Sequence, residues 1–196
     1  MITISLFWFL VAMSIAIFEI ELEGKYGWAE KSATWNRKFM PPKAFRLFSG
    51  ARVLTGYHLF LNIFLLLFMH SPFFFGLEFT FITELNLLAT YLVWTIFWDF
   101  LWFILNPYYG WKMFTPKAVW WFGEEPWLMN KLPVKYFIQI GVSLLLIILA
   151  IYIGGENRLL TNHFVMILLF IIFTILTHLL IRPLFHKYYW ALHKKV

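Results

Sequence analysis

The chain lacks cysteine altogether and carries little charge. Of its 196 residues, none is Cys and only 13% are Asp, Glu, Lys or Arg, whereas soluble globular proteins carry about 25% charged residues. Without cysteine the chain can form no disulfide, no iron–sulfur cluster and no thiolate metal site. The sequence also contains no glycine-rich phosphate loop, no G-x-S-x-G motif and no H-E-x-x-H motif. Cysteine chemistry is therefore excluded, and histidine and carboxylate side chains become the candidates for metal binding and proton transfer.

Apolar residues dominate the composition of the chain. Hydrophobic residues make up 62% of the chain, aromatic residues 22%, and the mean hydropathy is +0.74. A transmembrane helix needs about 20 mostly apolar residues, and an unsatisfied backbone cannot face lipid, so such runs must be helical. The sequence therefore predicts an all-α integral membrane protein, with residues 1–196 forming a single transmembrane helical domain. Five runs meet the length requirement, at about 2–21, 53–75, 79–106, 134–153 and 161–184.

The charges that are present lie mainly in two long connecting segments, 24–52 and 107–133, and in the C-terminal tail. If five spans alternate, one side holds fifteen of the sixteen Lys and Arg residues, with Arg158 the exception. The positive-inside rule makes that side cytoplasmic. We expect a multi-pass cell membrane protein, N-terminus outside and C-terminus cytoplasmic, with the two segments lying as amphipathic interfacial segments on the cytoplasmic side. The net charge of +6 then reflects contact with membrane lipids and anionic headgroups, and not nucleic acid.

Polar residues inside the predicted spans fall at a common depth. At 1.5 Å per residue, they lie roughly 5 to 13 Å below the cytoplasmic interface. An ionisable residue in a span is a functional hypothesis by default. Asp99 is the most unusual, because it stands alone in the apolar run from Trp94 to Pro107. The layer contains Glu19, His58, Asn62, Asp99, Gln139 and His178.

This layer favours a membrane enzyme that acts on a lipid or another lipophilic small molecule. The candidate catalytic residues are Asp99, His58, Asn62 and Glu19, since a buried carboxylate and a neutral imidazole suit proton transfer. The same region predicts a divalent metal site for Zn, Fe or Mn, because mixed nitrogen and oxygen donors fit these ions. Its candidate ligands are His58, Asp99, Glu19 and His178. Asp99 is expected to meet His58 and Asn62, together with Glu19 or His178.

Three alternatives stay open. A proton- or cation-coupled transporter or channel would use a polar stripe on the third span, and such a small bundle would be expected to form an oligomer. A non-catalytic membrane subunit is compatible with the same sequence. A haem-b electron carrier would pair His58 with His178 and His70 with His163, although His58 and His70 lie about 120° apart around their helix. The stripe consists of Glu84, Tyr91, Thr95, Asp99 and Asn106.

Overall fold

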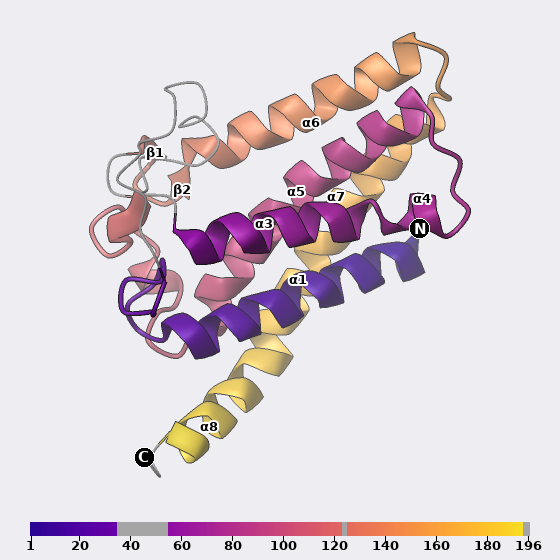
Figure 1. Ribbon diagram of the computed structural model, residues 1–196. Coiled ribbons are helices and arrows are strands. Elements are labelled where there is room, and N and C mark those ends of the chain that lie inside the picture. The colour runs from indigo at the N-terminus through magenta and orange to yellow at the C-terminus, as the bar shows by residue number, and fades with distance from the viewer. Residues whose placement is uncertain (35–54, 123–124, 194–196) are drawn as a thin grey trace.

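The chain is mostly helical and has little sheet. Four helices are long and apolar enough to cross a membrane, as expected for a multi-pass membrane protein. They are α1 (Ile2–Glu23), α5 (Phe81–Leu105), α6 (Val134–Tyr152) and a continuous helix over Arg158–His193. The computed structural model (Figure 1) describes residues 1–34, 55–122 and 125–193.

The predicted second span, 53–75, is shorter than expected, so the count of five spans is not met. Helix α3 covers Gly56–Met69, which is 14 residues or about 21 Å, against a hydrocarbon thickness of about 30 Å. The Thr55 hydroxyl accepts a hydrogen bond from the backbone N–H of His58 and caps the first turn. Beyond His70 the chain enters the separate short helix α4 (Ser71–Phe74), which carries a proline near its start. Residues 53 and 54 lie outside the described residues.

The predicted fifth span, 161–184, belongs to a longer helix made of three parts. Helix α7 (Arg158–Leu176) runs into a π-helical turn (Thr177–Ile181) and then into α8 (Arg182–His193). Pro183 lacks a backbone N–H, and its ring would clash with a carbonyl one turn earlier in a regular α-helix. The wider π turn directly before it relieves this conflict. In Figure 1, α8 extends beyond the other helices.

Successive helices run in opposite directions, so the molecule has two distinct ends (Figure 1). At one end lie the close of α1 and α5, the start of α3 and α6, and the described parts of the two connecting segments. We call it the basic end. The start of α1, helix α4 and the turn between α6 and α7 lie at the opposite end, here called the far end. The alternation expected from the sequence is thus present among the described helices.

Helix α5 forms the centre of the bundle and packs most extensively against α6 and α1. Its core side chains include Val93, Trp94 and Leu101, all fully buried. Large apolar side chains on the outer helices remain exposed, as expected of surfaces that contact lipid. Examples are Phe60, Leu67, Leu145, Leu168 and Leu179.

The two predicted interfacial segments do not form helices of useful length in their described parts. Residues 24–34 form turns, and 35–54 lie outside the described residues. The segment 107–133 contains two single-turn 3₁₀ helices and a minimal hairpin, because Pro107, Pro116 and Pro126 interrupt it. The two turns are Trp111–Met113 and Trp120–Phe122, and the hairpin pairs β1 (Trp127–Leu128) with β2 (Leu132–Pro133).

Candidate functional site

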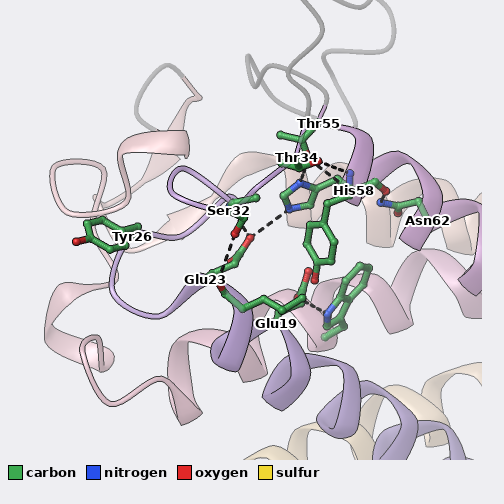
Figure 2. A network of polar contacts seen from close by, with 12 residues as sticks. Glu19, Glu23, Tyr26, Ser32, Thr34, Thr55, His58 and Asn62 are labelled. Carbon is green, nitrogen blue, oxygen red and sulfur yellow. Dashed lines mark hydrogen bonds and ion pairs between the residues drawn. The ribbon is translucent and has the colours of Figure 1, made fainter. Parts of the chain in front are cut away.

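Three metal-ligating side chains meet at the basic end, where α1 closes and α3 begins. Glu19, Glu23 and His58 each offer one ligand atom, and these atoms all lie within 4.8 Å of one another. The three residues are only 6%, 7% and 4% exposed. Figure 2 shows the two carboxylates and the imidazole turned toward one another. We call Glu19, Glu23 and His58 the carboxylate–histidine cluster.

The two carboxylates are oriented by groups from outside α1. Glu19 and Glu23 are one helical turn apart and so share a face of the helix. The indole N–H of Trp98 on α5 donates to Glu19 Oε2 over 2.7 Å. The backbone N–H of Ala29 donates to Glu23 Oε1 over 2.7 Å. Each carboxylate therefore has one oxygen committed to a fixed donor.

The His58 ring is held on both sides. Its Nδ1 lies 2.6 Å from the Thr55 hydroxyl, which leaves Nε2 facing Glu23 Oε1 at 3.5 Å. The Trp28 ring stacks on the imidazole with centroids 3.7 Å apart and planes 17° apart. Trp28 thus covers the cluster from the side of the first connecting segment.

A strained turn places Trp28 there. Gly27, Trp28 and Ala29 have φ values of +68°, +46° and +51°, a region that costs a residue with a side chain about 1–2 kcal/mol. The hydrogen bond from Ala29 to Glu23 helps to offset this cost. Such strain is typical of functional sites.

Two tyrosines border the cluster. The Tyr57 hydroxyl is buried beside Glu19, although the pair does not meet the geometry of a hydrogen bond. Tyr109, in the segment after α5, donates to the backbone carbonyl of Lys25 over 3.0 Å. Burial raises the pKa of Tyr109, and the negative charges of Glu23 and Glu30 raise it further. This hydrogen bond joins the two connecting segments beside Glu23.

Asp99 has different partners from those expected. Its Oδ2 accepts a hydrogen bond from the Tyr136 hydroxyl over 2.8 Å and lies 3.4 Å from Lys135 Nζ. Lys135 is only 8% exposed, lies 3.9 Å from Glu125 Oε2 and sits 3.4 Å from the centre of the Phe122 ring. We call Asp99, Glu125, Lys135 and Tyr136 the lysine cluster. The expectation that His58, Asn62 or His178 pairs with Asp99 is wrong among the described contacts, because Asp99 faces α6 while His58 faces the close of α1.

The Asn62 side chain makes one hydrogen bond within α3 and one to α5. Its amide donates to the His58 carbonyl over 2.7 Å, and its oxygen accepts from the Tyr91 hydroxyl at 3.4 Å. Thr95, one turn further along α5, accepts from Gln139 of α6 at 3.4 Å. The contacts with Tyr91 and Gln139 join helices, and none of these hydrogen bonds involves the side chains of the carboxylate–histidine cluster.

The ends of the polar stripe are also paired. Glu84 lies 3.1 Å from Nε2 of His70 at the far end. At the basic end the Asn106 amide donates to the Gly24 carbonyl over 2.8 Å, and its side-chain oxygen accepts from the backbone N–H of Tyr108 over 3.0 Å. Every member of the stripe thus meets another helix or segment.

The remaining histidines lie apart from the cluster. His178 occupies the π turn after α7, and its ring makes no hydrogen bond or ion pair with the described residues. His163 is buried and lies 3.1 Å from the Ser143 hydroxyl. The structure therefore unites two of the four predicted metal ligands, Glu19 and His58, and adds Glu23.

The sequence did not predict the roles of two residues, Glu23 and Lys135. Glu23 resembles a solvated helix end beside Lys25, yet the fold buries it. Lys135 resembles a connecting-segment lysine, yet it enters the bundle at the first turn of α6. The four-residue spacing, which places Glu23 on the same helix face as Glu19, could have indicated Glu23. No local pattern marks Lys135.

No protein family matches the chain, and neither does any curated protein or solved structure.

Proposed function

We propose that the protein is a multi-pass membrane enzyme whose carboxylate–histidine cluster holds a divalent metal, Zn, Fe or Mn, for acid/base chemistry on a lipophilic substrate. The observation that carries this proposal is the convergence of three buried ligand atoms from two helices within 4.8 Å. Charge supports it. With both carboxylates ionised and the imidazole neutral, the cluster would carry a charge of −2, and a buried net charge is costly unless a counter-ion is present. A divalent cation balances that charge.

The orientation of the donors supports the same conclusion. Metal ligands are normally fixed by hydrogen bonds on their far side. Thr55 holds Nδ1 of His58, Ala29 holds Glu23 and Trp98 holds Glu19. His58 Nε2 then faces Glu23 Oε1 at 3.5 Å, and one ligand atom from each residue converges within 4.8 Å. The donor set of one nitrogen and two carboxylates is compatible with Zn, Fe or Mn.

The chain's own residues suggest a division of roles. A bound metal would supply Lewis acidity and a lowered pKa for coordinated water. Glu19, with one oxygen free of Trp98 and the Tyr57 hydroxyl beside it, is placed to take up or release a proton. The stacked Trp28 ring excludes bulk water from above. We propose that the basic end is cytoplasmic, because Lys and Arg gather there, and that a lipophilic substrate reaches it from that leaflet.

Metal analysis tests this proposal directly. The wild-type protein in lipid nanodiscs should contain about one Zn, Fe or Mn per chain, and Glu23→Gln or His58→Asn should lose it. Glu21→Gln is the matched control, because Glu21 lies on the same helix but its carboxylate is 47% exposed and pairs with His193. Wild-type protein that binds none of the three metals, and gains no thermal stability when they are added, would contradict the metal site. A lipid extract incubated with metal-loaded protein should change in composition, and extract incubated with Glu23→Gln protein should not.

Transport of protons or cations is the second candidate, and the lysine cluster favours it. Asp99 lies within electrostatic reach of Glu19, so ionisable groups run from α3 across α1 and α5 to α6. In liposomes, Asp99→Asn should abolish a proton flux that depends on this row. Asn still accepts from Tyr136, and Lys135 keeps Glu125, so folding should survive. Wild-type liposomes that conduct no faster than empty ones would remove this alternative and leave the enzyme proposal standing.

A further inference from the structure

A cavity of about 350 Å³ opens at the far end of the bundle, between α1, α4, α5 and α7. Its apolar wall includes Met69, Leu87 and Met166. Its size falls within the range of about 300–1,000 Å³ that small-molecule sites occupy. It lies at the opposite end from the carboxylate–histidine cluster and is independent of it. Polar groups enter it from three helices, namely Ser5, Thr83, Asn86, Thr90, Asn162 and His163.

Ser5 is the first sign that this cavity receives a polar group. The residue is only 1% exposed, and its hydroxyl has no hydrogen-bond partner within the described part of the chain. A serine in a helix can bond back to the carbonyl one turn earlier, as Ser14 of the same helix does to Leu10 over 2.8 Å. Ser5 instead leaves its hydroxyl unsatisfied at the cavity wall. A buried polar group without a partner costs about 1–3 kcal/mol.

Two amides face the same cavity. Asn86 on α5 and Asn162 on α7 are partly buried and line the cavity. No side-chain hydrogen bond of either amide occurs among the described residues. An asparagine in a transmembrane bundle normally bonds a neighbouring helix, as Asn62 does with Tyr91. Three hydrogen-bonding groups thus surround one space and do not satisfy one another.

The remaining lining limits the chemistry of a ligand. Among the described residues, no Asp, Glu, Lys or Arg side chain lines the cavity, and its histidine, His163, lies 3.1 Å from the Ser143 hydroxyl. At its rim, Ile4 is 60% exposed and Leu77 is 46% exposed, so the opening adjoins apolar surface that lipid would cover. An anionic or cationic ligand would find no charged side chain to pair with, and a pure hydrocarbon would leave Ser5, Asn86 and Asn162 unsatisfied.

We propose that this cavity binds an uncharged lipophilic molecule that presents a hydroxyl or carbonyl oxygen to Ser5, Asn86 and Asn162. A long-chain alcohol, an isoprenoid alcohol and the ester region of a neutral lipid share this chemistry. The apolar remainder of the molecule lies against Leu87 and Met166 and leaves the cavity past Ile4.

Photolabelling in nanodiscs tests the proposal with two matched probes. One is a long-chain alcohol that carries a diazirine, and the other is the same chain without the hydroxyl. The alcohol should label 1–8 and 159–166 about ten-fold more than the hydrocarbon does, since one satisfied buried group is worth about 1–3 kcal/mol. Excess unlabelled alcohol should compete. Lipid-facing residues outside both segments, such as Leu145, which is 65% exposed, should take up both probes equally.

Substitutions in the cavity distinguish specific binding of the alcohol from non-specific contact with lipid-facing surface. Ser5→Ala and Asn162→Leu should each reduce capture of the alcohol, whereas Ser14→Ala, on the same helix but outside the cavity, should not. Asn162→Leu should also raise the unfolding temperature of delipidated protein, because it removes an unsatisfied amide. Equal labelling by the two probes, or labelling by the alcohol that persists in the Ser5→Ala, Asn162→Leu double variant, would overturn the proposal.

Discussion

At the scale of single residues, the acidic side chains differ in whether a cation accompanies them. Asp99 and Glu125 share Lys135, so the lysine cluster already contains a positive charge. Glu19 and Glu23 make no ion pair with Lys or Arg in the described part of the chain, and only His58 lies close enough to help. This difference is why we assign the metal to the carboxylate–histidine cluster and not to Asp99.

A second pair of ionisable residues, His70 and Glu84, predicts a pH-dependent stability. Burial acts to lower the pKa of His70, but hydrogen bonds to the Leu66 carbonyl and to Glu84 outweigh it, and the pKa is raised above its ordinary value of 6.5. A raised pKa means that the folded state binds the proton more tightly than the unfolded state does. The stabilisation is therefore fully present below pH 6.5 and is lost as pH rises through the raised pKa.

The measurement is thermal unfolding of wild-type and Glu84→Gln protein over a pH range that starts below 6.5 and extends above the raised pKa of His70. The stability difference between the two should be largest at low pH and shrink as pH rises. Glu78→Gln, a nearby change at a residue outside this pair, should give a difference that does not vary with pH. A wild-type advantage over Glu84→Gln that grows with rising pH would contradict the assignment.

At the scale of elements, the turn between α1 and the rest of the first connecting segment positions the site. Gly27 lies against the Trp121 ring, and a Cβ at this position would overlap that ring. Trp121 belongs to the second connecting segment, so this contact joins the two segments above the cluster. Trp28 follows directly and stacks on His58.

Two glycine substitutions separate backbone strain from this contact. Gly24 and Gly27 both have positive φ, but nothing lies within 4 Å of a Cβ at Gly24. We expect Gly24→Ala to cost about 1–2 kcal/mol through strain alone. Gly27→Ala should cost more, displace Trp28 and weaken metal binding.

Tryptophan fluorescence and metal analysis of the two variants provide the readout. Equal losses of stability with unchanged metal content in both would show that the contact with Trp121 does not support the site.

At the scale of the whole molecule, the two ends differ in charge, and this difference predicts orientation. Lys31 and Lys117 lie in the two connecting segments of the basic end, whereas Glu156 lies in the turn between α6 and α7, and all three are exposed. Because positive residues stay in the cytoplasm, cysteines at Lys31 and Lys117 should resist an impermeant thiol reagent applied to intact cells. A cysteine at Glu156 should react.

The native chain contains no cysteine, so it is its own background control, and permeabilised cells should label all three positions. Labelling of positions 31 and 117 in intact cells would reverse the orientation, and with it the proposed access of substrate from the cytoplasmic leaflet.

By itself the sequence determined the helical class, four of the runs that form long apolar helices, the alternation of ends and the placement of Glu19 and His58 toward the same end. These follow from hydropathy and helix rise, which are properties of a single segment. It misjudged the second span, because Thr55 and Pro72 shorten a run whose apolar composition continues past both.

Only the tertiary structure decided which polar groups meet. The direction in which a side chain points depends on how its helix is rotated, and each residue turns the helix by about 100°. An uncertainty of one or two residues in a helix end therefore exchanges one neighbour for another. That is why Glu23 joined Glu19 and His58, while Asp99 turned to Lys135 and Tyr136 on α6.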